Sequence, residues 1–283
     1  MERQGAREAE IPRARSVSPE WLTREARKVR RRILLTIQAA GLGHVGGDLS
    51  VSDILTTLVF GVLNVDPDNP AKADRDRLIL SKGHCSAALY TVLARRGFFD
   101  EAELATFMKP LSRLNGHPDR RKVPGVEANT GPLGHGLPIA VGAAIGLGLR
   151  GFKSRCFCVT GDGELQEGSN WEAIMYAGHR RLRNLTAVVD RNGLQQGATT
   201  AATNDLTPLA EKFSAFGWDV EEVDGHDHRQ LLDVLGHRAH EKPLMVLART
   251  VKGKGVSFME GRVEWHHKVP SDEQFADALK ELA

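Results

Sequence analysis

Short apolar segments with the character of β-strands alternate with helix-like segments along most of this 283-residue chain. The segments expected to be strands are residues 77–80, 156–160, 186–189, 219–223 and 244–248. The segments expected to be helices among them are residues 87–95, 101–109, 137–149, 171–179, 209–216 and 230–239. Such alternation is typical of an α/β fold, a mostly parallel sheet with helices on both faces. Ligands on these sheets bind beyond the carboxyl ends of the strands, so function is expected in the loops that follow them.

The start of the chain predicts a tail followed by helices. Residues 1–17 are expected to be a flexible tail and residues 18–283 one folded domain. A first helix is expected from Ser18, which is followed by proline, to Gly41. A second helix is expected to begin at residues 50–53, which resemble a capping box. The Gly- and Ala-rich segment 137–149 is expected to be a buried, closely packed helix.

Charge and cysteine usage exclude several classes of protein. Lys plus Arg number 38 and Asp plus Glu 36, and this balance predicts no strong global attraction to nucleic acid or acidic membranes. The N-terminal residues are not expected to form a secretory leader, and no apolar run is expected to approach the length of a membrane span. Three cysteines without a CxxC pair argue against a disulfide framework, and Cys156 and Cys158 are expected to be buried thiols. We therefore expect a cytoplasmic protein.

Two polar loops follow neighbouring strand segments and carry the clearest chemical signal. Asp162 comes after the strand at 156–160, and Asn192 comes after the strand at 186–189. One strand–helix–strand unit separates the two loops, so both are expected at the same edge of the sheet. A carboxylate and an amide oxygen are ligands that suit Mg²⁺, and Gly163 leaves space where a phosphate could approach.

Each half of this pair has a simpler explanation. Gly161-Asp162-Gly163 taken alone is equally consistent with an ordinary Asp-Gly turn. The spacing of an EF-hand calcium loop is absent, and so is a dinucleotide-binding fingerprint. The combination of both loops, each after a strand, is much more specific than either one.

Residues 161–168, Gly-Asp-Gly-Glu-Leu-Gln-Glu-Gly, resemble the transketolase version of the diphosphate motif of thiamin diphosphate enzymes. Arg191 departs from the asparagine or aspartate that this family usually has beside Asn192. The resemblance implies thiamin diphosphate and Mg²⁺, or Ca²⁺ or Mn²⁺ in its place. The implied metal ligands are Asp162, Asn192 and the carbonyl of Leu194. The implied cofactor-binding residues in these two loops are Gly161, Gly163, Glu164 and Asn192.

Four histidine motifs resemble four further loops of the same family. They are residues 43–47, 81–84, 115–118 and 265–268. The resemblance implies that His84 and His266 bind the cofactor on its diphosphate side. It implies that His44 and His117 lie near the reacting carbon, with His266 completing the catalytic set. Imidazole suits these roles because it donates to phosphate and hydroxyl oxygens and changes charge near neutral pH.

A glycine-containing loop, residues 129–136, resembles the cofactor loop of the family. The resemblance implies that Gly131, Pro132 and Leu133 contact the cofactor. His135 stands where the family usually has glutamine.

Other residues carry weaker signals. Glu167 resembles the family's glutamate at the subunit contact, although a carboxylate at a helix N-terminus is also favoured by the helix dipole. Residues 252–255, Lys-Gly-Lys-Gly, fit either a phosphate-facing loop or a solvated basic turn. His226 and His228 match no motif and are expected at the surface, whereas His267 stands where the family often has glycine.

The chain ends soon after the last histidine motif, without the second run of strands and helices expected for a pyrimidine-binding domain. In the transketolase family that domain supplies the glutamate that activates the cofactor. The resemblance therefore implies the diphosphate-binding subunit of a split transketolase, active only with a separate C-terminal subunit. It implies transfer of a two-carbon ketol unit from a ketose or ketose phosphate to an aldose, in an α₂β₂ heterotetramer.

Three alternatives remain open at this point. The α chain of a ketoacid dehydrogenase, or another acyl-transferring thiamin enzyme, shares the motif from Asp162 to Asn192. A non-catalytic domain could keep the same fold. A nucleic-acid site would rest on the basic residues at 28–32 alone, and no aromatic residues interleave with them.

Overall fold

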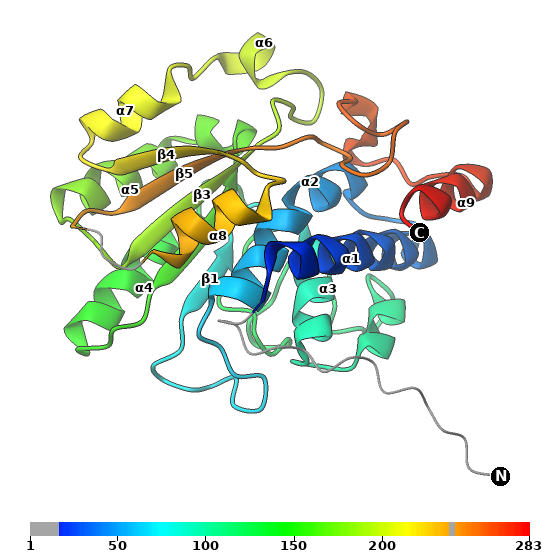
Figure 1. Ribbon diagram of the computed structural model, residues 1–283, viewed down its shortest axis with the longest axis horizontal. Coiled ribbons are helices and arrows are strands. Elements are labelled where there is room, and N and C mark those ends of the chain that lie inside the picture. The colour runs from blue at the N-terminus through cyan, green and yellow to red at the C-terminus, as the bar shows by residue number, and fades with distance from the viewer. Residues whose placement is uncertain (1–16, 238–240) are drawn as a thin grey trace.

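The computed structural model describes residues 17–237 and 241–283. Its five strands form one sheet in the order β1-β2-β3-β5-β4, and every neighbouring pair is parallel (Figure 1). The strands are β1 (Arg77–Leu80), β2 (Cys156–Gly161), β3 (Leu185–Arg191), β4 (Asp219–Asp224) and β5 (Leu244–Arg249). The predicted α/β fold with a parallel sheet is confirmed.

Helices cover both faces of this sheet. The hydrophobic core on one face of the sheet includes residues of α1 (Pro19–Ala40), α2 (Val45–Thr56), η1 (Thr57–Val62), α3 (Ser86–Arg96), α8 (His228–Gly236) and α9 (Asp272–Glu281). The other face packs against α4 (Gly136–Leu149), α5 (Gly168–His179) and α7 (Leu209–Ala215). The shorter helices are η2 (Glu101–Thr106), η3 (Gly163–Gln166), α6 (Thr200–Asn204) and η4 (Val263–His266). The end expected for α8, at residue 239, lies outside the described residues.

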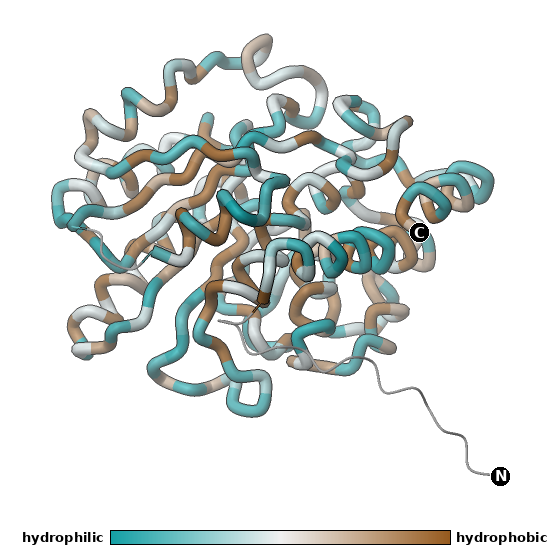
Figure 2. Tube along the Cα trace, in the orientation of Figure 1, coloured by the Kyte–Doolittle hydropathy of each residue, from teal (hydrophilic) through white to brown (hydrophobic). Residues whose placement is uncertain are grey.

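Alternate residues of each strand point into the two cores. In β2, Phe157 and Val159 belong to the core beneath α1, whereas Cys156 and Cys158 belong to the core beneath α4. Both thiols are fully buried and free, as expected. Figure 2 shows the consequence: the central strands are largely hydrophobic, while α1 and α9 carry many hydrophilic residues.

The first helix follows its sequence signals closely. The Ser18 hydroxyl accepts a hydrogen bond from the N–H of Trp21 at 3.2 Å, and Gly41 ends α1 in the left-handed conformation with φ of 67°. Val17, expected to be the last residue of the flexible tail, packs against the core instead. Of the tail expected for residues 1–17, residues 1–16 lie outside the described residues.

The second helix begins five residues earlier than expected. α2 starts at Val45, and the carbonyl of His44 accepts from the N–H of Asp48 at 3.1 Å. The Ser52 hydroxyl donates to the carbonyl of Asp48 one turn back within the helix, and the Ser50 Oγ lies 3.1 Å from the carbonyl oxygen of Gly47, so neither side chain caps the start of a helix. The capping-box interpretation of residues 50–53 was therefore wrong.

Residues Val45–Val62, which join α2 to η1, are long and apolar enough to cross a membrane by length and composition. The expectation that no run has this property was wrong. The segment is 94% buried inside this fold, so it is accounted for as the central helix of a protein core.

Helix α4 is less buried than its composition suggested. Leu137 and Ala144 face the core, but Ile139 is 41% exposed and Leu149 is 84% exposed. Added side chains at three of its glycines would meet nothing within 4 Å, namely at Gly142, Gly146 and Gly148. One face of α4 therefore carries small apolar residues that no other described part of the chain covers, which corrects the expectation of a buried, closely packed helix.

Candidate active site

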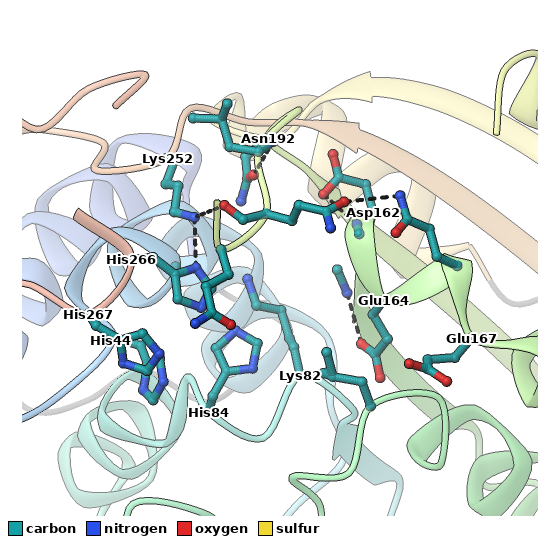
Figure 3. A pocket seen from close by; sticks show the side chains of 18 of the residues that line it. His44, Lys82, His84, Asp162, Glu164, Glu167, Asn192, Lys252, His266 and His267 are labelled. Atoms are coloured by element: carbon teal, nitrogen blue, oxygen red, sulfur yellow. Dashed lines mark hydrogen bonds between the residues drawn. The ribbon is translucent and has the colours of Figure 1, made fainter. Parts of the chain in front are cut away.

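The loops after β1, β2, β3 and β5 meet at the carboxyl edge of the sheet and, with the start of α2, surround a cavity of about 340 Å³ (Figure 3). Most of the predicted site residues line it. They are His44, His84, Gly131, Leu133, Gly161, Asp162, Gly163, Glu164, Glu167, Asn192, Leu194 and His266. Segments from almost the whole length of the described chain thus contribute to one site.

Asp162 joins the loop after β2 to the loop after β3. It caps η3, with Oδ1 accepting from the N–H of Gly163 at 2.9 Å and Oδ2 accepting from the N–H of Gly193 at 2.6 Å. Burial raises the pKa of this carboxyl to about 6, even though the Gly193 N–H favours its ionised form. A bound cation would lower that pKa again, so the position suits a metal ligand.

Asn192, in the loop after β3, is held in a fixed orientation by two hydrogen bonds. Its Nδ2 donates to the Ser50 hydroxyl at 3.2 Å, and its Oδ1 accepts from the N–H of Leu194 at 3.0 Å. An amide oxygen has two lone pairs, so Oδ1 can also bind a cation. Gly193, between the two, has φ of 76°, a conformation that favours glycine.

The carboxylate of Glu164 forms its hydrogen bonds with other groups of the protein. Its Oε1 accepts from the Ser81 hydroxyl and from the N–H of Gly134 at 2.9 Å, while Oε2 accepts from the N–H of Gly161 at 3.0 Å. Burial raises the pKa of this carboxyl. The side chain therefore ties together the loops after β1 and β2 and the loop before α4.

A buried ion pair lies beneath the cavity and was not predicted. The Lys82 ammonium donates to Oδ2 of Asp190 at 2.6 Å, and the Ser50 hydroxyl donates to the same oxygen at 2.6 Å. Burial opposes the charged form of Lys82, but Asp190 outweighs it and raises the pKa of the ammonium. Asp190 also accepts from the Thr250 hydroxyl, so one carboxylate joins the end of β3 to α2 and to the loops after β1 and β5. In the sequence, the available signal for a buried charge here was that the apolar strand β3 ends in charged residues, of which Asp190 is one.

The histidines predicted from separate motifs form one cluster. The ring centroid of His44 lies 5.0 Å from that of His84, 5.5 Å from that of His266 and 6.5 Å from that of His117. His267 is closer still, at 4.2 Å from His44, and also lines the cavity. Nitrogen atoms of His44, His266 and His267 lie within 4.8 Å of one another.

Burial keeps these imidazoles neutral. It lowers the pKa of His44 to about 4 and that of His266 to about 3, and neighbouring positive charges add to the effect. Burial also lowers the pKa of His84 and His117. At neutral pH the rings of His44, His84, His117 and His266 therefore offer N–H donors and nitrogen acceptors without a net charge.

Lys252 completes this wall of the cavity. Its side chain is buried, and Nζ lies 2.9 Å from Nδ1 of His266 and 3.4 Å from the carbonyl oxygen of Gln195 (Figure 3). Burial and the charge of Lys82 lower the pKa of the Lys252 ammonium to about 8. Of the two interpretations of residues 252–255, the structure favours the loop that faces the cavity over a solvated basic turn.

Glycines allow the loops to approach one another. A Cβ atom on Gly131 would lie 2.7 Å from the ring of His117, and one on Gly83 would lie 2.6 Å from the backbone of Thr130. At Gly161, in contrast, an added Cβ would meet no atom closer than 3.9 Å. Backbone near Gly161 thus borders free space, as a cradle for a phosphate group requires.

A few sequence expectations do not meet this geometry. Pro132 is exposed and does not line the cavity, and neither does His117, whose ring lies behind Gly131 with its centroid 6.5 Å from that of His44. His226 and His228 were expected at the surface, which was wrong: His228 is 3% exposed, and Nδ1 of His226 lies 2.6 Å from Oδ2 of the buried Asp53. No motif marked them because their partner, Asp53, is remote in the sequence.

The family model for the thiamine diphosphate binding domain of transketolase matches residues 23–282. The chain belongs to this transketolase family. An apulose-4-phosphate transketolase subunit of Actinobacillus succinogenes is 45% identical over 269 residues, which cover 94% of this chain and 98% of that protein. A 6-deoxy-6-sulfo-D-fructose transketolase subunit of a Clostridium species is 41% identical over 263 residues, which cover 92% of this chain and 96% of that protein. These matches favour the transketolase branch over the α chain of a ketoacid dehydrogenase.

Solved transketolases share the fold. The transketolase of Campylobacter jejuni superposes with a TM-score of 0.86 at 30% identity, covering 92% of this chain but 42% of that one. Human transketolase is 36% identical over 248 residues, and the match spans 39% of its length. This chain thus corresponds to about two-fifths of the single-chain transketolases, whereas it matches the separate transketolase subunits over nearly their full length.

The donors in the cavity fit the cofactor of this family. Oxygen atoms of Asp162 and Asn192 are the hard ligands that Mg²⁺ prefers, and they lie at one end. From the facing wall, Lys252 and the N–H groups of the imidazoles would donate to the oxygens of a diphosphate held by that metal. Imidazole nitrogens are poor ligands for Mg²⁺, so a Mg²⁺ ion would fit the oxygen-lined end better than the imidazole cluster.

Proposed function

We propose that this chain is the diphosphate-binding subunit of a two-component, thiamin diphosphate-dependent transketolase. The observation that carries the proposal is the convergence of Asp162 and Asn192 with a wall of neutral imidazoles in one cavity. The full-length match to proteins named as transketolase subunits supports it. The reaction would transfer a two-carbon ketol unit from a ketose phosphate to an aldose acceptor.

The cofactor and its metal would bind between the loops after β2 and β3. Asp162, Asn192 and the Leu194 carbonyl would hold Mg²⁺, with Ca²⁺ or Mn²⁺ able to replace it. When bound, thiamin diphosphate supplies an electron sink beside the carbonyl carbon of the substrate. The free space at Gly161 and the N–H of Gly163 favour approach of the diphosphate.

The imidazoles would divide between cofactor and substrate. Lys252 faces Nδ1 of His266, which leaves Nε2 of that ring to carry its proton and donate to a diphosphate oxygen. His84 would donate beside it. His44 and His117, also neutral, would donate to the carbonyl or hydroxyl oxygens of the sugar and accept protons from them.

A separate pyrimidine-binding subunit would close the site. Glu167 is exposed at the rim of the cavity, and the free apolar face of α4 follows directly after the loop that carries Gly131 and Leu133. Exposed Ile139 on α4 and Met175 on α5 extend that apolar surface. We assign this surface to contact with the pyrimidine-binding chain and propose an α₂β₂ heterotetramer. The three buried free thiols suit the reducing cytoplasm.

Co-expression with the matching C-terminal subunit tests the proposal. The two chains should co-purify, and ketol transfer from a ketose phosphate should require both chains, thiamin diphosphate and Mg²⁺. Gly146→Arg should block co-purification because it places a long charged side chain on the free face of α4. Its matched control is Arg183→Ala, a charge change on an exposed turn. Full turnover by this chain alone would contradict the two-subunit proposal, and a stable complex without any transfer would favour a non-catalytic domain.

A further inference from the structure

A buried polar cluster lies outside the cavity, on the α2 side of the sheet. Its centre is Asp53 on α2, which is 4% exposed. The Arg30 guanidinium of α1 binds both carboxylate oxygens, and the His226 and His228 rings approach them from the segment after β4. Burial would raise the pKa of Asp53, but Arg30 and the histidines outweigh it and hold the pKa well below its usual range. Asp53 is therefore a fixed negative charge.

His226 connects this charge to the backbone of the active-site loop. Its Nδ1 lies 2.6 Å from Oδ2 of Asp53, and its Nε2 accepts a hydrogen bond from the N–H of Val251 at 2.9 Å. A backbone N–H can only donate, so Nε2 carries no proton and the proton is on Nδ1, where it is donated to Asp53. The contact with Val251 thus selects one neutral tautomer of the ring.

Val251 immediately precedes Lys252, the residue that faces His266. The same short loop is fixed on either side of it. Thr250 donates its hydroxyl to Asp190, and the N–H of Gly253 donates to the carbonyl of Gly46 at 2.9 Å. Between these two anchors, the Val251 N–H is bound by the His226 imidazole.

Close packing shows that the segment carrying His226 is built to approach this loop. A Cβ atom on Gly225 would lie 2.5 Å from the side chain of Thr250 and 2.9 Å from the carbonyl oxygen of Arg249. The N–H of Gly225 donates to that oxygen at 2.7 Å. The segment after β4 is therefore held against the end of β5 by its glycine.

We propose that His226 is a positioning residue, whose imidazole, fixed between the Asp53 carboxylate and the Val251 N–H, sets the loop that directs Lys252 toward His266. It touches neither cofactor nor substrate. The inference deepens the proposed function, because the Lys252–His266 pair is there assigned to the diphosphate side of the site. The contact itself does not depend on that assignment.

Imidazole nitrogen NMR of the full chain tests the contact without any cofactor. His226 should appear at pH 7.5 as a neutral ring protonated on Nδ1, assigned by its loss in His226→Gln. The His266 signals should shift in His226→Phe, which can neither donate to Asp53 nor accept from Val251. They should stay in place in His226→Gln, since a carboxamide offers one donor and one acceptor.

The matched control is His228→Asn. His228 contacts Asp53 and Thr57 in the same cluster but is not bonded to Val251, so its loss should destabilise the fold while the His266 signals stay unchanged. An Nε2-protonated His226 would overturn the inference. So would His266 signals that are unmoved in His226→Phe, or moved equally in His228→Asn. If His226→Phe does not fold, the tautomer of the His226 ring in the wild-type protein decides whether the inference holds.

Cofactor affinity of the two-subunit complex provides the functional readout. His226→Phe should weaken thiamin diphosphate binding by roughly ten- to a hundredfold, the range for losing one hydrogen bond to a charged group. His226→Gln and His228→Asn should stay within about threefold of wild type. Unchanged affinity in His226→Phe would overturn the positioning role. Absence of binding by wild type would instead contradict the proposed function, and the His266 signals would still decide this inference.

Discussion

The two ends of the cavity satisfy their polar groups in different ways. At the end formed by the loops after β2 and β3, the carboxylates of Asp162, Glu164 and Asp190 are bound by backbone N–H groups, hydroxyls or an ammonium from the protein itself. At the other end, the rings of His44, His84 and His266 contact one another and are kept neutral by burial. The oxygen-lined end is thus fixed when the chain folds, whereas the imidazole end offers donors to a ligand.

The largest effect is expected at the oxygen-lined end. Asp162→Ala removes an anionic ligand and the link between two loops, so ketol transfer by the two-subunit complex should fall by roughly a thousandfold or more. Glu211→Ala, the same loss of charge at an exposed position of α7, should retain wild-type turnover. Wild-type activity in Asp162→Ala would remove the metal assignment.

A slightly smaller effect is expected at the imidazole end, and it should divide by residue. With cofactor in excess, His117→Ala should lower kcat by about 10²- to 10³-fold, as expected when one donor acting in the transition state is lost. His84→Ala should instead raise the concentration of thiamin diphosphate needed for half activity. His179→Ala, at an exposed helix end, is the control. Identical kinetic defects in His84→Ala and His117→Ala would contradict the division into cofactor and substrate sides.

The structural role of Glu164 predicts an effect on stability. Glu164→Ala leaves the N–H groups of Gly134 and Gly161 without their partner, so the free energy of unfolding should fall by about 2–3 kcal/mol. Glu164→Gln keeps one acceptor oxygen and should lose about half as much. Urea unfolding of the isolated chain measures both. Unchanged stability in Glu164→Ala would mean that the loops are held together by other contacts.

The smallest effect concerns pH and the neutral imidazoles. Burial lowers the pKa of His44 from 6.5 to about 4, so the unfolded chain binds more protons between these values and stability falls as the pH drops through that range. Between pH 7.5 and pH 5, the free energy of unfolding should therefore fall by about 1 kcal/mol less in His44→Gln than in wild type, a figure already reduced for the partial exposure of the ring. The measurement is the difference in urea midpoint, with His179→Gln as control. Equal losses in wild type and His44→Gln would place the ring in solvent.

Sequence reasoning reached the fold and most of the cavity because both depend on local patterns. Strand segments ending in polar loops were visible directly, and Asp162 and Asn192 followed two neighbouring strands. The histidines came from short motifs that the structure brings into one cluster. Their roles, like the ligand roles of Asp162 and Asn192, stay predictions.

Pairings between distant segments could not be predicted in the same way. Lys82 and Asp190 form a buried ion pair across 108 positions, and neither position carries a sign of its partner. His228 was expected at the surface because Asp53, which it approaches, lies on another helix. The free face of α4 was missed because glycine and alanine suit both a buried helix and one that awaits a partner.

The central claim is that the loops after β2 and β3 hold a metal that in turn holds the diphosphate. Calorimetric titration of thiamin diphosphate into the two-subunit complex, with Mg²⁺ and with EDTA, tests it in wild type and Asp162→Ala. Removal of Mg²⁺ should weaken binding strongly in wild type but hardly further in Asp162→Ala, because the substitution has already removed the metal site. Equal dependence on Mg²⁺ in both proteins would show that the metal binds elsewhere and would contradict the account.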